Sequence, residues 1–165
     1  MLQYPILSGK NDNEYTFDTA SQVAYEVVFK PSPYLFDEGS AFSRHVVELV
    51  IRISKDSVNQ RPGLDKLVAP TIASIITDYY QIRHETVALY ICDSSDGKQA
   101  ARKRKFDDWF RYFNQDDFLK HDLPITDLND GVTYYNAIIL RVDNSYRDEI
   151  IAEFEAVFGR YNDPK

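Results

Sequence analysis

The chain has a single cysteine, Cys92, and no apolar run of about 18 residues, the length needed to cross a bilayer. A lone cysteine cannot form a disulfide within the chain, which is typical of a reducing compartment. The first residues, Met1 to Leu7, lack both the basic region and the long apolar region of a secretion signal. We therefore expect a cytoplasmic protein that does not enter a membrane.

Several motifs of catalysis are also missing. His45, His84 and His121 share no metal-ligand spacing with each other or with Cys92, so no zinc site is predicted. The cysteine has no histidine nearby in sequence, and the carboxylate of Asp93 disfavours a thiolate. Neither the Walker A spacing nor the dinucleotide glycine pattern is present. The sequence therefore specifies neither a reaction nor a cofactor, and it does not decide whether the protein is an enzyme.

The composition favours one folded domain. The 165 residues are 44% hydrophobic and 14% aromatic, which is ample for a core, and no linker or repeat divides them. We expect a single domain over residues 1–165. The net charge of −7 argues against bulk binding of nucleic acid, which normally needs a broad basic face.

Hydrophobic periodicity predicts an α+β fold, with an antiparallel sheet and three main helices packed on it. The expected order is three strands, helix, strand, helix, strand, helix. The expected strands are 14–18, 23–29, 45–53, 86–91 and 132–142, and the helices follow Pro70, Gly97 and Ser145. The first two strands should form a hairpin, and the fourth, being apolar throughout, should be buried on both faces.

The remaining segments carry finer expectations. Residues 31–43 and 114–130 are predicted as loops, the second with a short strand at 123–125 and a turn at Asn129 to Gly131. The stripe of the first helix should end at Ile82 or Arg83. Asn144 or Ser145 should begin the last helix, in a capping box with Asp148.

The best candidate site is the junction between the apolar strand and the second helix, from Cys92 to Arg104. Five cations lie within residues 98–105, so the rest of the chain carries −7 − 5 = −12. Unpaired backbone N–H groups and the positive end of the helix dipole should converge there and attract an anion. The candidate ligand-binding residues are Asp93, Ser94, Ser95, Asp96, Gly97, Lys98, Gln99 and Arg102.

The position of Arg102 sharpens this prediction. A helix over residues 97–113 places Arg102 on the same face as Phe106 and Trp109, close to the core, where a cation needs a partner. The partner is either an anionic ligand or a local carboxylate, Asp93 or Asp96. In the second case Asp96 or Ser95 caps the helix, and residues 103–105 form a solvated face.

The same segment carries a resemblance. Residues 89–99, with Arg102, Arg104, Phe106 and the pair Trp109-Phe110, are similar to an uncharacterised family of small bacterial proteins, a domain of unknown function. The strand at 25–29, the helix at 71–76 and the pair Tyr134-Tyr135 extend the resemblance over nearly the whole chain. It implies that the segment from Cys92 to Phe106 is a shared feature, and it implies no activity, cofactor or partner.

A second resemblance concerns the order of elements. Three antiparallel strands, a helix, a strand, a helix and a further strand resemble the core of acetyl-coenzyme A dependent N-acyltransferases. The resemblance implies a cofactor pyrophosphate on a glycine-rich turn before the first helix, where this chain reads Gln60-Arg61-Pro62-Gly63-Leu64-Asp65. Pro62 removes an amide donor there, and Asp65 would repel phosphate. The final helix, residues 145–158, is an addition to that core.

Our leading interpretation is therefore a cytosolic protein that binds an anionic ligand, for example a phosphate-bearing molecule, or a protein partner at the Cys92–Arg104 junction. Two alternatives stay open. One is an N-acyltransferase-like enzyme that uses an acyl-coenzyme A. The other is an acidic interaction or regulatory protein of the antitoxin type, which would neutralise a basic partner.

Overall fold

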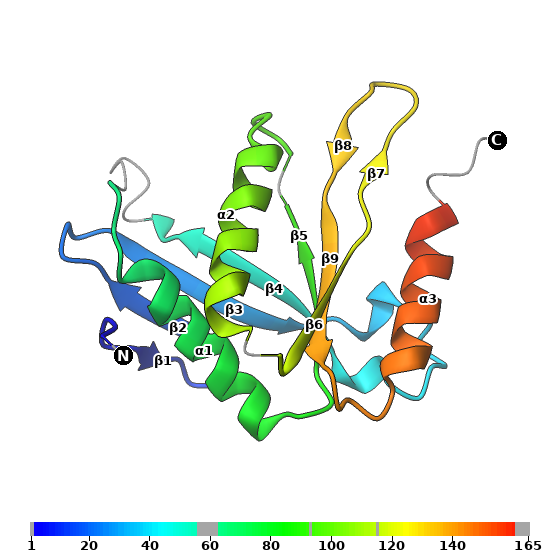
Figure 1. The fold of residues 1–165 in the computed structure, drawn as a ribbon, viewed down its shortest axis with the longest axis horizontal. Helices are drawn as coiled ribbons and strands as arrows, with labels where there is room; N and C mark the ends of the chain where they lie inside the picture. Colours follow the sequence, from blue (N-terminus) through cyan, green and yellow to red (C-terminus); the bar gives the residue numbers. More distant parts are fainter. Residues whose placement is uncertain (1, 56–62, 93, 115, 161–165) are drawn as a thin grey trace.

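The computed structural model describes residues 2–55, 63–92, 94–114 and 116–160, with backbone only for Phe113. It has an α+β fold with three main helices, as the sequence predicts, but the strand order differs in detail (Figure 1). The strands are β1 (Leu7–Ser8), β2 (Glu14–Asp18), β3 (Ala24–Pro31), β4 (Val46–Ile53), β5 (Val87–Ile91), β6 (Phe118–Asp122), β7 (Ile125–Thr126), β8 (Thr133–Tyr134) and β9 (Asn136–Arg141). The helices are α1 (Val68–Ile82), α2 (Gln99–Phe113) and α3 (Arg147–Gly159), with short 3₁₀ turns at Pro33–Leu35 and Ser43–His45.

The main sheet has seven strands in the order β1-β2-β3-β4-β5-β9-β6. It is mostly antiparallel, but β4 and β5 run parallel, so the expectation of a purely antiparallel sheet is wrong at this pair. The reason is the connection: α1 lies between these two strands, and a strand that returns through a helix to its neighbour runs parallel to it. The parallel pairing covers only Val46–Glu48 and Val87–Leu89, after which the strands diverge (Figure 1).

The predicted hairpin of β2 and β3 is confirmed. Glu14 pairs with Val28 and Asp18 with Ala24, and the chain reverses where the Thr19 N–H donates to the carbonyl of Val23. The predicted third strand is confirmed as β4, antiparallel to β3 along its whole length.

Three strand predictions are corrected. The short strands β1 and β6 were not predicted, and β6 lies within the polar segment that was expected to be a loop. The predicted strand over 132–142 is two strands separated at Tyr135. The first, β8, pairs with β7 in a small second sheet, whereas β9 joins the main sheet between β5 and β6. The turn before β8 is present, with Gly131 in the left-handed region and its N–H bonded to Asp127.

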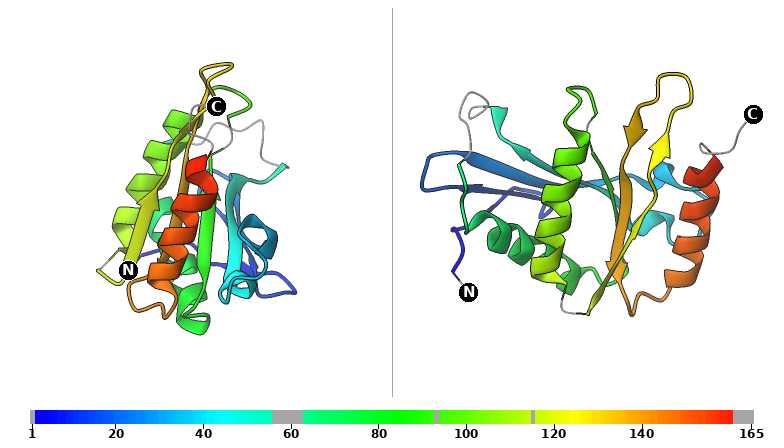
Figure 2. Two further views of the ribbon diagram at one scale, coloured as in Figure 1. Left: turned by 90° about the vertical axis from the view of Figure 1, so that its right-hand side faces the viewer. Right: turned by 45° about the horizontal axis from the view of Figure 1, so that its top comes forward.

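Helices cover both faces of the main sheet. The buried residues of α1 and α2 pack on one face, with those of β2, β3 and β4. On the other face, the cover that the described residues provide lies at the β5–β9 end, where Ile150 and Phe154 of α3 pack with Phe36 and Phe42 from the segment after β3. Figure 2 shows α3 at this end of the sheet, away from the N-terminal strands. The strand β5 lies between the two helical layers. Its residues from Val87 to Tyr90 are therefore buried on alternate faces, as predicted.

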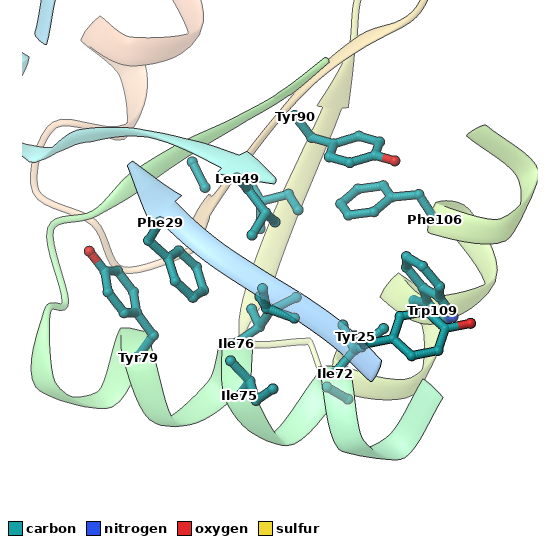
Figure 3. Close-up of a cluster of buried hydrophobic side chains, with 14 of the residues drawn as sticks. Tyr25, Phe29, Leu49, Ile72, Ile75, Ile76, Tyr79, Tyr90, Phe106 and Trp109 are labelled. Atoms are coloured by element: carbon teal, nitrogen blue, oxygen red, sulfur yellow. The ribbon is translucent and has the colours of Figure 1, made fainter. Parts of the chain in front are cut away.

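An aromatic cluster holds α2 on the sheet (Figure 3). Phe106 stacks on Tyr90 of β5, with ring centroids 3.7 Å apart and planes at 9°. Trp109, one turn further along α2, is buried and lies beside Tyr25 of β3. These contacts confirm the predicted stripe at Phe106 and Trp109, and they make α2 span the sheet from β5 to β3.

The ends of two helices differ from prediction. The buried stripe of α1 ends at Tyr79 and Tyr80, because Ile82 is 76% exposed and the Arg83 N–H closes the helix on the Tyr79 carbonyl. The capping box of α3 does not form. Ser145 instead binds Glu85 through its N–H and hydroxyl, and the Asn144 side chain accepts from the N–H of Tyr146, just before the helix begins.

Candidate functional site

The predicted anion-binding turn is already occupied by a carboxylate of the chain itself. Residues 94–97 form a turn in which the Gly97 N–H donates to the Ser94 carbonyl, and Gly97 has φ +73°, which glycine adopts readily. The Asp96 carboxylate accepts the N–H of Lys98, immediately before α2. Asp96 therefore lies beside the start of α2, although no described side chain caps the N–H groups of the first turn of the helix. Asp93, one of the predicted site residues, lies outside the described residues.

Arg102 makes the local pairing that the sequence left open. Its two terminal nitrogens donate to both carboxylate oxygens of Asp96, at 2.6 and 2.7 Å. The Arg102 guanidinium is the main cause that holds the pKa of Asp96 well below its usual value, and the hydrogen bond from Lys98 adds to it. Both side chains are partly exposed, so the pair fixes the turn against the helix more than it stabilises the fold.

Gln99 connects the start of α2 to the β7–β8 hairpin. Its side-chain amide donates to the Thr133 carbonyl at 3.4 Å, and its carbonyl oxygen is buried without a partner among the described residues. Ser94 is half-buried, while Ser95 and Lys98 are exposed. The predicted residues thus gather around one turn, but only Arg102 faces the cleft described next.

A cleft of about 660 Å³ opens where β4 and β5 diverge, with α2 above it. Its volume is typical of small-molecule sites, which span roughly 300–1,000 Å³. The walls are a continuous stretch of β4, the end of β5 and one side of α2, together with Tyr25. The lining residues are Tyr25, Glu48, Leu49, Val50, Ile51, Arg52, Ile53, Tyr90, Ile91, Arg102, Lys105 and Trp109.

The cleft carries positive charge in an acidic protein. Three cations and one carboxylate line it, 3 − 1 = +2, whereas the whole chain carries −7. Two of the cations are compensated by carboxylates outside the lining, since Arg52 pairs with Glu26 and Arg102 with Asp96. The charge of Lys105 is the one that no such pair neutralises within the part of the chain that the structure describes.

Lys105 is held by aromatic rings. Its ammonium lies 5.3 Å from the centre of the Trp109 ring and 5.7 Å from that of Tyr25. The Lys105 residue is exposed overall, but partial desolvation beside the two rings disfavours the charged amine and lowers its pKa. An anion in the cleft would restore the lost solvation and oppose this shift. The arrangement can therefore bind a negatively charged group beside an aromatic wall.

A second polar cluster lies on the far side of the Tyr90–Phe106 stack, around a cavity of about 10 Å³, room for roughly one water. Asp107 accepts from Lys103 and pairs with Lys120. Burial opposes ionisation of Asp107, but these two lysines outweigh it and lower its pKa. The Cys92 thiol also borders this cavity, and burial raises its pKa, so the structure gives it no activation as a nucleophile.

A carboxylate of the chain itself also lies just before α1, where the acyltransferase resemblance implies a pyrophosphate. The Asp65 carboxylate accepts the Leu67 N–H at 2.9 Å and the Tyr4 hydroxyl at 2.7 Å. The preceding part of that turn, 60–62, lies outside the described residues. Asp65 would compete with an external phosphate for this end of the helix.

Across the described residues, no group of three or more His, Cys, Asp and Glu side chains is arranged to hold a metal ion. Nor does any helix in that part of the chain have the length and apolar character needed to span a membrane.

The fold and the cleft define an α+β protein whose mixed sheet opens between two adjacent parallel strands. The chain belongs to the Family of unknown function (DUF6169), whose model matches residues 64–156, more than half of its 165 residues. Comparisons with curated proteins and with solved structures gave no match. The matched residues include the Cys92–Arg104 junction, but the strand at 25–29, which the sequence resemblance included, precedes them.

Sequence reasoning missed the residues that make the cleft. Lys105 was placed on a solvated face in the alternative with a local Arg102 pair, and its side chain is exposed, but Arg102, Lys105 and Trp109 also follow the i, i+3, i+7 spacing of one helix side. Tyr25 and Tyr90 were predicted to lie in strands and were not included in any candidate site. That spacing was the available signal, whereas the divergence of β4 from β5 has no local signature.

Proposed function

We propose that this protein binds an anionic ligand in the cleft between β4 and β5. The observation that carries the proposal is Lys105, a cation with no carboxylate partner in the described chain, set over two aromatic rings in a cleft of about 660 Å³. A lysine that lines the cleft can approach an anion over a short distance, where Coulomb attraction is strongest. The aromatic wall favours a ligand that also has an apolar part.

The Cys92–Arg104 junction contributes Arg102 to this site. Its guanidinium lines the cleft while paired with Asp96, so a ligand with a second anionic group can share it or displace Asp96. The proposed site therefore keeps the predicted junction as one wall and adds Lys105 as its principal cation.

The test uses two variants that remove one positive charge from adjacent positions of α2. The variants are Lys105→Gln and Arg104→Gln: both side chains are exposed, but Lys105 lines the cleft and Arg104 is outside its lining. The probe is anilinonaphthalene sulfonate, an aromatic anion whose fluorescence rises on binding. We expect saturable binding to the wild type and to Arg104→Gln, weaker by about tenfold in Lys105→Gln. Inorganic pyrophosphate should displace the probe. Equal affinity for all three proteins would refute the proposal.

A second candidate function is N-acyl transfer from an acyl-coenzyme A. The parallel pair β4–β5, joined through α1 and followed by α2, is the observation in its favour. Asp65 weighs against it, because the carboxylate already holds the start of α1. We expect coenzyme A not to displace the sulfonate probe. Saturable displacement by coenzyme A, with product formed from acetyl-coenzyme A and an amine, would favour the enzyme.

A further inference from the structure

The cleft has one property that its side chains do not explain. Six consecutive residues of β4, from Glu48 to Ile53, all line it. Successive side chains of a strand point to opposite faces of the sheet, so they cannot all reach the same cleft. What six consecutive residues share is the strand edge. The cleft is therefore lined by the backbone of β4.

Hydrogen bonds at both ends of β4 show which backbone groups face β3. The N–H of Ser32 donates to the carbonyl of Val46 at 3.0 Å, and the N–H of Ser54 donates to the carbonyl of Ala24 at 2.8 Å. In an antiparallel pair, alternate residues direct both of their backbone groups to the same neighbour. The even-numbered residues of β4 therefore face β3.

The odd-numbered residues then face the side of β5. The pairing with β5 stops at Glu48 and Leu89, so no strand of the described chain pairs with this edge at Ile51 and Ile53. An N–H and a carbonyl from each of these two residues are directed into the opening. An unpaired edge of this kind is a template for another extended chain.

The opposite wall shows the same property over a shorter length. The Cys92 N–H donates to the Tyr135 carbonyl, on the side of β9, so the backbone groups of its neighbour Ile91 face the cleft. Ile91 is also 38% exposed, as expected for the end of a strand whose neighbour has moved away. Two strand edges thus border one slot.

We infer that the ligand of the cleft is an extended acidic peptide segment, which pairs as a strand with the β4 edge at Ile51 and Ile53. The inference rests on the proposed function and names its ligand class. Alternate side chains of the segment would face α2, where Lys105 is the uncompensated cation and Tyr25 and Trp109 form the wall. The free edge from Leu49 to Ile53 spans about 13 Å at roughly 3.3 Å per residue, which suits a segment of about five residues.

The experiment uses a capped hexapeptide of alternating glutamate and valine. Its matched control is the same peptide with N-methyl groups on alternate residues, which keeps every charge but removes backbone donors. We expect the first peptide to displace the sulfonate probe and the methylated one to bind about tenfold more weakly. In hydrogen exchange measured by NMR, the first peptide should slow the amides of Ile51 and Ile53. The amide of Val50, which faces β3, should change little.

The outcomes separate the inference from the proposed function. Equal binding of both peptides, without protection at Ile51 and Ile53, would overturn strand pairing and leave the anion site in place. Displacement of the probe by coenzyme A but by neither peptide would overturn the peptide ligand. Equal affinity of the probe for the wild type and for Lys105→Gln would overturn the proposed function and this inference with it.

Discussion

Phe106 offers the sharpest test of how α2 is held over the sheet. Its side chain is 1% exposed and stacks on Tyr90 at 3.7 Å. Truncation of a buried phenylalanine to alanine typically costs about 3–5 kcal/mol, because apolar contacts are lost and a cavity remains. The lost stacking accounts for about 0.5–1.5 kcal/mol of such a change. We therefore expect Phe106→Ala to lower the free energy of unfolding by about 3–5 kcal/mol.

That loss is large against the total stability of a domain, about 5–15 kcal/mol. For a chain of this size it corresponds to a fall in melting temperature of roughly 6–20 °C. Urea unfolding followed by the fluorescence of Trp109, the single tryptophan, reports directly on the seating of α2. The control is Tyr112→Ala on the same helix, where the side chain is 51% exposed and the change should stay within about 0.5 kcal/mol. A Phe106→Ala loss below about 1 kcal/mol, or an equal loss in both variants, would refute this account of the packing.

Two further predictions concern polar contacts. Pairing with Arg102 depresses the pKa of Asp96 below the unfolded value of about 3.9, so the stability that Asp96→Asn removes should be fully present above that pH and disappear as the pH falls through the folded pKa. Unfolding curves of the wild type and of Asp96→Asn, recorded from pH 7 downwards, measure this difference in stability, and a difference that stays constant with pH would contradict the pairing. The Ser40 hydroxyl lies within hydrogen-bond distance of both carboxylate oxygens of Glu153 on α3, so Glu153→Ala should lower the free energy of unfolding in urea by about 1–2 kcal/mol. An equal loss in Glu149→Ala, at an exposed position of α3, would contradict this role.

The elements that were predicted correctly are those whose patterns are local. The continuous apolar run at Val87 to Ile91 indicated a strand buried on both faces, and it is one. The aromatic spacing at Phe106 and Trp109 indicated the buried side of α2. In both cases the residues that make the pattern also make the core contacts, so tertiary structure did not override local preference.

The strand β6 could not be predicted in this way. Its sequence, from Phe118 to Asp122, contains a lysine and a histidine and has only one buried side chain, Phe118. It is a strand because it pairs with β9 along its whole length, and strand formation depends on such context more than on intrinsic preference. The parallel orientation of β4 and β5, by contrast, agrees with the helix that connects them, because a parallel pair needs a long crossover connection.

The candidate site depends on both kinds of information. The charge of the junction is visible in the sequence, but the cleft exists only because two neighbouring strands separate. Separation leaves backbone groups unpaired, and each missing hydrogen bond costs about 0.5–1.5 kcal/mol. The helix α2 packs across this opening, with Phe106 against Tyr90 of β5 and Trp109 beside Tyr25 of β3. Three of these four aromatic residues also line the cleft. The opening is therefore tied to core packing. We expect a substitution that displaces α2 from the sheet to weaken ligand binding, even when residue 105 is still a lysine.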